Sequence, residues 1–207
     1  MVITNEDIAV DLDKCINGIE LEELFGRTAP FHLEIGSGKG TFLLNEARTH
    51  PELNYLGIEW ANEFYRYSVD RICRWGLTNV RILRADARDV IGRFLPDESV
   101  AMLHVYFPDP WPKNRHHKRR FFASANLRHV FRCLIKGGEL HLATDHADYF
   151  VIISDLLLRD SQIAPLFREI DFITADTAEE GEWVGTNFER KYIREGRRIY
   201  TLAVEKL

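Results

Sequence analysis

The stretch that decides the fold is FHLEIGSGKGT, residues 31–41. It begins as a short apolar run typical of a buried strand, and three glycines, Gly36, Gly38 and Gly40, lead into the helical pattern TFLLNEART at 41–49. Glycine lets the backbone pass close to a ligand, and the helix that follows presents its N-terminus there. The stretch therefore predicts a strand, a ligand-binding turn and a helix, although a tight turn without a ligand is the alternative.

Strand and helix patterns then alternate along the chain. Four more strands are expected at 54–60, 80–87, 100–107 and 138–145, and helices at 61–75, 88–95, 125–135 and 147–160. The helix at 125–135 is expected to end at Gly137–Gly138, because glycine favours helix C-termini. This order predicts a parallel sheet with helices on both faces.

The last part of the chain breaks this alternation. Residues 167–177 and 197–207 look like two strands with no clear helix between them, which favours an antiparallel hairpin at one edge of the sheet. The expected fold class is therefore α/β, a Rossmann-like, mostly parallel seven-stranded sheet with helices on both faces and an antiparallel C-terminal hairpin strand. We expect residues 1–207 to form a single domain, with 1–29 as an appendage that carries a helix at 19–25.

Composition indicates a globular protein without membrane spans. The chain is 45% hydrophobic and 29% charged, and it has no run approaching 18 apolar residues. The N-terminus is acidic and has no basic-then-apolar signal pattern. Cys15, Cys73 and Cys133 are widely spaced and form no CxxC pair, which is typical of reduced thiols. We therefore expect a cytoplasmic protein, with a monomer and a homodimer both open.

Two phosphate-binding motifs are excluded at the glycine turn. In the Walker pattern G-x-x-x-x-G-K-[ST], Leu33 stands in place of the first glycine and Gly40 in place of the Ser or Thr. In the dinucleotide pattern G-x-G-x-x-G, Thr41 stands in place of the third glycine. The turn therefore predicts a ligand other than a nucleotide polyphosphate.

Acidic residues mark the ends of three successive predicted strands, namely Glu34, Glu59 and Asp86. In parallel α/β sheets, ligands bind at the carboxyl ends of the strands. Glu59 follows Gly40 by 19 residues and is suited to accept both ribose hydroxyl hydrogens, while Asp86 is suited to an exocyclic amine. Together with the glycines, these acids predict a site for S-adenosylmethionine, an adenosine with a charged amino-acid tail and no phosphates.

The fourth strand runs into YFPDPWPKNRHHKRR, residues 106–120. Pro108, Pro110 and Pro112 remove backbone donors and restrict φ, so the chain continues neither as a strand nor as a helix. This elbow is expected to hold Asp109 beside the methyl group of the cofactor. Trp111 is then free for base stacking, or it belongs to the core as the alternative.

Two basic patches stand out in this acidic chain. Residues 113–120 hold five Lys or Arg and no acid, and residues 190–198 hold five against Glu195 alone. The whole chain has 27 basic and 32 acidic residues. When these ten cations and this one acid are left out, the rest of the chain has only 17 basic residues against 31 acidic ones. Such clustering indicates an anion-binding surface, with a solvated face as the alternative. His116 and His117 have no third ligand at a suitable spacing, so no metal is expected.

At these motifs the sequence resembles the tRNA (guanine-N7)-methyltransferase family of the bacterial type. Its members are S-adenosylmethionine-dependent enzymes of the Rossmann-like class I methyltransferase fold. The matching stretches run in the family's order from residue 33 to about 200: LEIGSGKG, GIEW, RADA, YFPDPWPKNRHHKRR, LATDHADY and TNFERKYIREGRRIY. The PDPWPKxRHxKRR and TxFExK segments are specific to the family. Many members carry a longer basic N-terminal arm, whereas this chain starts acidic.

The resemblance implies methyl transfer to N7 of a guanine in the variable loop of tRNA, position 46, which forms 7-methylguanosine. It implies that the cofactor is contacted by Glu34, Gly36, Gly38, Gly40, Glu59, Asp86 and Asp109, with Asp109 as the catalytic residue. It implies substrate contacts from Lys113, Asp145, Thr186, Asn187, Phe188 and Glu189. It also implies RNA contacts from Arg115, His116, His117, Lys118, Arg119 and Arg120.

The chemistry of the reaction agrees with these residue types. Guanine N7 has a lone pair and no proton, so methyl transfer to it depends on positioning and needs no base. Positive charge moves from the sulfonium to the guanine ring, where the Asp109 carboxylate stabilises it. Two alternatives stay open: an exocyclic-amine methyltransferase, because Asp109-Pro110-Trp111 is faintly similar to the D/N-P-P-Y/W motif, and a non-catalytic RNA-binding protein on a vestigial fold.

Overall fold

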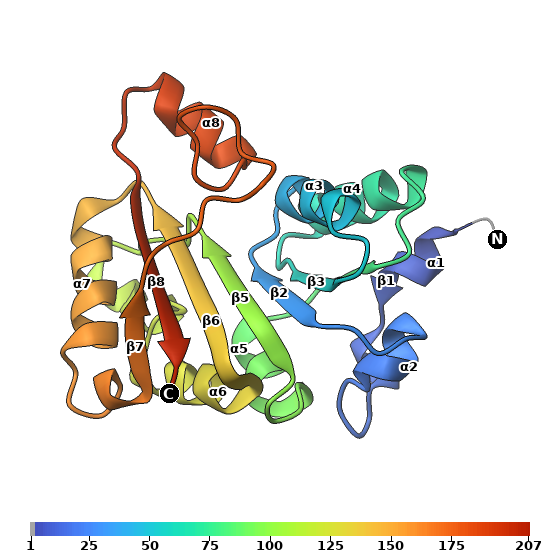
Figure 1. The fold of residues 1–207 in the computed structure, drawn as a ribbon, viewed down its shortest axis with the longest axis horizontal. Helices are drawn as coiled ribbons and strands as arrows, with labels where there is room; N and C mark the ends of the chain where they lie inside the picture. Colours follow the sequence, from blue (N-terminus) through green and yellow to red (C-terminus); the bar gives the residue numbers. More distant parts are fainter. Residues whose placement is uncertain (1–2) are drawn as a thin grey trace.

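The computed structural model describes residues 3–207 and is built on one mixed sheet (Figure 1). Its eight strands have the order β1-β4-β3-β2-β5-β6-β8-β7. Their bounds are β1 Ala9–Val10, β2 Phe31–Ile35, β3 Asn54–Ile58, β4 Val80–Leu83, β5 Val100–Tyr106, β6 Leu134–Thr144, β7 Phe167–Ile170 and β8 Tyr200–Lys206. The first six strands pair in parallel, and β8 is antiparallel to both β6 and β7. The expected α/β class is confirmed.

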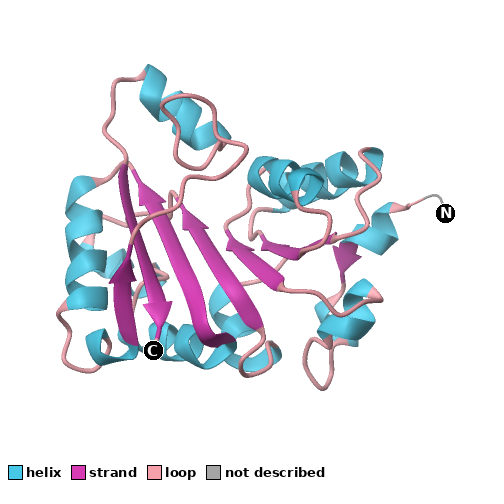
Figure 2. Cartoon of the chain, viewed as in Figure 1, coloured by secondary structure: helices cyan, strands magenta, loops and turns pink. Residues whose placement is uncertain are grey.

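The helices alternate with the strands along the chain and pack on the sheet (Figure 2). The α-helices are α1 Asn5–Ile8, α2 Leu21–Phe25, α3 Thr41–Thr49, α4 Asn62–Arg74, α5 Ala87–Asp89, α6 Ser124–Cys133, α7 Ala147–Leu158 and α8 Asn187–Arg194. Four further helical segments are η1 Leu12–Lys14, η3 Asn114–Arg119 and η4 Ala164–Leu166, which are 3-10 helices, and the π-helical η2 Val90–Phe94. No helix of residues 3–207 is long and apolar enough to cross a membrane.

Successive side chains of a strand point to opposite faces of the sheet, so the strands contribute to two hydrophobic cores, one on each face. On β3, Tyr55 packs into the cluster that includes residues of α3 and α4, whereas its neighbour Leu56 packs into the cluster that includes residues of α6 and α7. Helices therefore cover both faces, as the sequence pattern predicts.

The structure corrects the sequence interpretation at four points. The sheet has eight strands instead of seven, because Ala9–Val10 in the expected appendage pair with β4. The strand expected at 167–177 ends at Ile170. A helix, α8, does lie between the last two strands. The helix expected to end at Gly137–Gly138 ends at Cys133, and both glycines belong to β6.

The physical reason for the last correction is a register shift between β5 and β6. The pairing jumps from Val100↔Leu134 to Met102↔Glu139, so the extra residues of β6 form an irregularity. At Gly138 an added Cβ would lie 2.9 Å from the Ile135 carbonyl oxygen, so glycine here permits close backbone packing within a strand.

Candidate functional site

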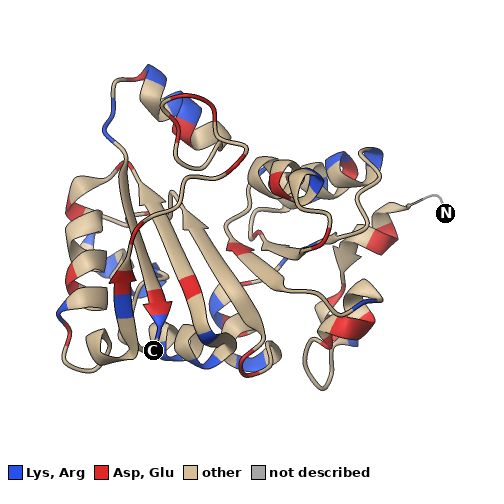
Figure 3. Ribbon diagram, viewed as in Figure 1, with Lys and Arg blue, Asp and Glu red and all other residues tan. Residues whose placement is uncertain are grey.

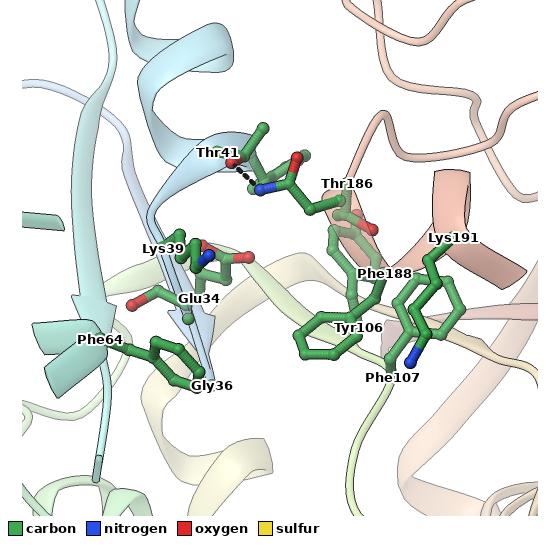
Figure 4. Close-up of a pocket in the computed structure, with 14 residues that line it drawn as sticks. Glu34, Gly36, Lys39, Thr41, Phe64, Tyr106, Phe107, Thr186, Phe188 and Lys191 are labelled. Atoms are coloured by element: carbon green, nitrogen blue, oxygen red, sulfur yellow. Dashed lines mark hydrogen bonds between the residues drawn. The ribbon is translucent and has the colours of Figure 1, made fainter. Parts of the chain in front are cut away.

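A pocket of about 510 Å³ opens at the carboxyl end of β2. The chain adds β3 and β4 on one side of β2, and β5 and β6 on the other, so this is the point where the strand order reverses. The lining residues come from the loop after β2, from α3, α4, the end of β5 and α8: Glu34, Gly36, Ser37, Gly38, Lys39, Thr41, Phe42, Phe64, Tyr106, Phe107, Thr186, Asn187, Phe188 and Lys191. Figure 4 shows the α8 residues facing the glycine loop across this space.

The glycine loop turns sharply before α3. Gly40 is the residue before the helix and has φ +65°, and its N–H donates to the Ser37 carbonyl at 2.8 Å. An added Cβ at Gly40 would lie 3.0 Å from Cβ of Ser68 on α4, so both conformation and space require glycine here. The turn thus brings the backbone of Gly36 and Gly38 to the pocket wall.

Glu59 fastens this loop to the end of β3. It is buried, its Oε2 accepts the Gly38 N–H at 2.8 Å, and its Oε1 accepts the Ala61 N–H at 2.7 Å. Glu59 does not line the pocket. Its contact with a ribose stays a prediction, and the structure adds a loop-holding role that sequence reasoning missed.

Glu34 places a buried carboxyl at the base of the pocket. Only 3% of the residue is exposed, and its Oε2 has no hydrogen-bond donor among the described residues. Burial, aided by the negative charge of Glu59, raises the pKa of Glu34 to about 8. A buried acceptor without a donor fits a cationic N–H group, which is the chemistry of an amino-acid ammonium.

Two of the acids that were predicted to contact ligands, Asp86 and Asp145, form ion pairs with arginines. The guanidinium of Arg88 forms a bidentate pair with Asp86, and this hydrogen bonding lowers the pKa of Asp86. Arg197 donates to Asp145 Oδ2 at 2.6 Å. Neither acid lines the pocket, so their predicted roles in binding adenine and substrate require that a ligand share or displace these pairs.

The backbone of the proline elbow is strained at Phe107 and Trp111, and one arginine side chain holds the elbow by hydrogen bonds. Phe107 and Trp111 have φ of +53° and +41°, values that non-glycine residues rarely adopt. Arg120 donates to the carbonyl oxygens of Pro110 at 2.8 Å and Trp111 at 3.3 Å. Asp109 is exposed on this elbow and makes no hydrogen bond or ion pair within residues 3–207. Its carboxylate is therefore free to meet a ligand.

The start of α8 forms the opposite wall of the pocket. Asn187 donates to Thr41 Oγ1 at 2.8 Å, which links α8 to α3. Glu189 is fully buried and accepts the backbone N–H groups of residues 183, 184 and 185 at 2.6 to 3.0 Å. Glu189 thus shapes the loop before α8, while Phe188 reaches the pocket itself.

The basic run at 113–120 mostly faces solvent. Lys113, Arg115, Lys118 and Arg119 are exposed, and Arg119 lies 5.0 Å over the ring of Trp111. Arg120 differs, because its guanidinium points back to the elbow and lies 4.9 Å over the Tyr149 ring. Trp111 is partly buried and has His116 against it at 5.5 Å, so it belongs to the elbow and not to the main core.

The structure therefore brings together only part of the predicted set. Six of the predicted residues line the pocket: Glu34, Gly36, Gly38, Thr186, Asn187 and Phe188. Sequence reasoning missed Lys39, Thr41, Phe64 and Phe107, and it placed Lys191, the last residue of the TxFExK motif, in the second basic patch instead of the pocket. Residues 3–207 contain no group of three or more His, Cys, Asp or Glu side chains placed to hold a metal ion.

The fold is that of the S-adenosylmethionine-dependent methyltransferases. The chain is similar to the aminoglycoside resistance methyltransferase NpmB1, with a TM-score of 0.60 and 18% identity over 99% of this chain and 94% of that one. It is also similar to a SAM-dependent methyltransferase from Aquifex aeolicus, with a TM-score of 0.58 and 13% identity over 96% and 100%. At these identities the likeness shows the fold alone.

Sequence comparison identifies the family. Residues 28–202 match a family described as putative methyltransferase. A tRNA (guanine-N(7)-)-methyltransferase of Alkalilimnicola ehrlichii is 39% identical over 91% of this chain and 77% of its own length, and one of Streptococcus thermophilus is 34% identical over 88% and 84%. The chain belongs to the tRNA (guanine-N7)-methyltransferase family.

Proposed function

We propose that this protein transfers a methyl group from S-adenosylmethionine to N7 of a guanine in tRNA, at position 46 of the variable loop. The observation that carries the proposal is the pocket at the switch point, with a donor-less buried acid at its base and the free Asp109 on the elbow after the neighbouring strand. The enzyme would work in the cytoplasm, as a monomer or a homodimer.

The residues of the pocket fit the cofactor. Glu34 Oε2 offers an acceptor to its ammonium, and the glycine loop allows close backbone approach. The apolar part of the lining, from Phe64, Tyr106 and Phe188, suits its uncharged surface. When bound, S-adenosylmethionine supplies the methyl group as part of a sulfonium cation.

The chain itself contributes position and charge. The elbow, stiffened by its prolines and by Arg120, holds the Asp109 carboxylate on the binding edge of the sheet. There Asp109 orients the guanine through its N–H groups and stabilises the positive charge that grows on the ring. Because N7 carries no proton, Asp109 acts without removing one. Exposed cations at 113–119 hold the phosphates of the RNA.

The test is to incubate the protein with unfractionated tRNA that lacks the modification, together with labelled S-adenosylmethionine, and to map the labelled nucleoside. We expect 7-methylguanosine in the variable loop. A label on an exocyclic amine would overturn the N7 assignment and support an amine methyltransferase. Cofactor and tRNA binding without any transfer would indicate the RNA-binding alternative.

A further inference from the structure

One face of α4 carries a row of aromatic and basic side chains that leads out of the pocket. Phe64 in the pocket wall is followed by Tyr67, Arg71 and Trp75, a spacing of three, four and four residues that keeps them on one side of the helix. Tyr67 is 46% exposed and Trp75 is 51% exposed. From Tyr67 to Trp75 the row extends by about 12 Å.

Cations from α3 and its preceding loop sit on these rings. The Lys39 ammonium lies 5.6 Å over the Tyr67 ring, and the Arg48 guanidinium lies 4.1 Å over the Trp75 ring. Arg71 stands between the two rings and donates to the Lys39 carbonyl and to Thr41 Oγ1. None of these three cations has a carboxylate partner within 4 Å among residues 3–207, although the protein as a whole is acidic.

The acids of α4 do not cancel this charge. Asp70 already pairs with Arg74 at 2.8 Å, which leaves Glu63 as the remaining carboxylate of the helix. About half of Tyr67 and of Trp75 remains exposed beside these cations, so both rings keep area for stacking. A surface that alternates aromatic rings with cations that have no carboxylate partner among residues 3–207 fits a nucleic-acid strand, because bases stack on the rings and phosphates pair with the cations.

We infer that this face, defined by Lys39, Arg48, Tyr67, Arg71 and Trp75, binds a single-stranded segment of the tRNA substrate. The inference rests on the proposed function, and it adds a second RNA surface to the basic run at 113–120. The face is continuous with the pocket: Lys39 lines the pocket itself, and Arg71 donates a hydrogen bond to Thr41, which also lines it. Figure 3 shows basic residues on α3 and α4 as well as on α8, and all three elements contribute residues to the pocket wall.

The test compares tRNA affinity among Arg48→Gln, Trp75→Ala, Trp75→Phe and a control. Arg93→Gln is the matched control, because its guanidinium also lies over a ring, at 5.5 Å from Phe94, but η2 precedes the amino end of β5, away from the pocket. Arg48→Gln should lower the log-affinity versus log-salt slope by roughly 0.7 to 0.9. Trp75→Ala should weaken binding roughly fivefold or more, and Trp75→Phe should recover most of it.

Affinity for S-adenosylhomocysteine should be unchanged in all four variants, which shows that each one folds. A photo-crosslinking amino acid at position 67 should also label tRNA, with the crosslink lost when excess tRNA competes. If wild type methylates tRNA and the variants bind it like wild type, the α4 face is not an RNA surface. If the variants change dimerisation instead, a second copy of the chain covers the face. If wild type neither binds nor methylates tRNA, the proposed function fails together with this inference.

Discussion

Glu34 shows how one residue links binding to protonation. Burial raises its pKa to about 8, so at pH 7 the free protein holds this carboxyl mostly protonated. A cationic ligand favours the carboxylate, so binding of the cofactor should release close to one proton near neutral pH. As the pH increases towards 8, affinity for S-adenosylhomocysteine should therefore rise by up to about tenfold per pH unit.

The check is calorimetry in buffers with different ionisation enthalpies. Wild type should release a proton on binding, and Glu34→Gln should bind weakly without proton release. Equal proton release by the two proteins would contradict a pairing of Glu34 with the ammonium.

Asp109 is the second residue whose role can be isolated. Because Asp109 is exposed and makes no hydrogen bond or ion pair within residues 3–207, Asp109→Ala should leave the melting temperature almost unchanged. Turnover should fall by roughly 100-fold, since a charge that stabilises the cationic product is lost. The isostere Asp109→Asn should be badly impaired too, as measured by single-turnover methylation with bound cofactor. Near-normal turnover of this variant would show that the negative charge is dispensable.

At the scale of an element, the loop before α8 depends on one buried carboxylate. Glu189 accepts three backbone N–H groups, so Glu189→Ala leaves them without an acceptor and should lower the free energy of unfolding by about 2 kcal/mol or more. Because α8 forms a pocket wall, affinity for S-adenosylhomocysteine should fall as well. The control is Glu180→Ala, an exposed residue of the same loop. Wild-type affinity and proteolytic resistance of Glu189→Ala would refute this role.

At the scale of the whole molecule, buried titratable groups set the pH range of stability. His32, His104 and His141 lie across three neighbouring strands, and burial lowers their pKa values, to about 4 for His32. Unfolding lets them bind protons, so stability falls as pH drops below about 6.5. Glu34 acts in the opposite direction, because its raised pKa removes stability as pH rises from about 4.5 to 8.

These trends predict a stability maximum near pH 6.5 for the cofactor-free protein. Below that pH the three histidines outweigh Glu34, and above it the histidines no longer take up protons on unfolding, whereas Glu34 still titrates. Urea unfolding from pH 5 to 8.5 measures this profile, with a slope of about 1.4 kcal/mol per pH unit for each proton. Glu34→Gln should remove the alkaline decline and keep the acid one. An unchanged alkaline decline would mean that another group causes it.

The basic run gives a further prediction at this scale. Lys118 and Arg119 are exposed, so replacing both with Ala should lower the log-affinity versus log-salt slope for tRNA by up to about 1.5. Arg120 is tied to the elbow, so Arg120→Ala should instead lower stability and turnover. A wild-type salt slope in the double variant would assign the run to solubility and leave RNA binding to the other cations.

The sequence by itself determined the α/β class, the glycine turn and the family, because these depend on local patterns: strand periodicity, glycine spacing and the proline elbow. Periodicity located α3 and α4 almost residue by residue, but it missed α8, whose short polar helix is stabilised by the cap of Thr186 and by contacts with α3. It also missed the two-residue β1, which exists only because β4 offers it a partner.

Only the tertiary structure decided what each charged residue does. Glu59 and Glu189 look like ligand acceptors in the sequence, yet both bind backbone N–H groups of loops that the fold brings to them. Arg120 looks like one more cation of the basic run, yet it ties the elbow. A charge pattern states which side chains are present, whereas burial and distance decide their partners, and the energy of a charge depends on both.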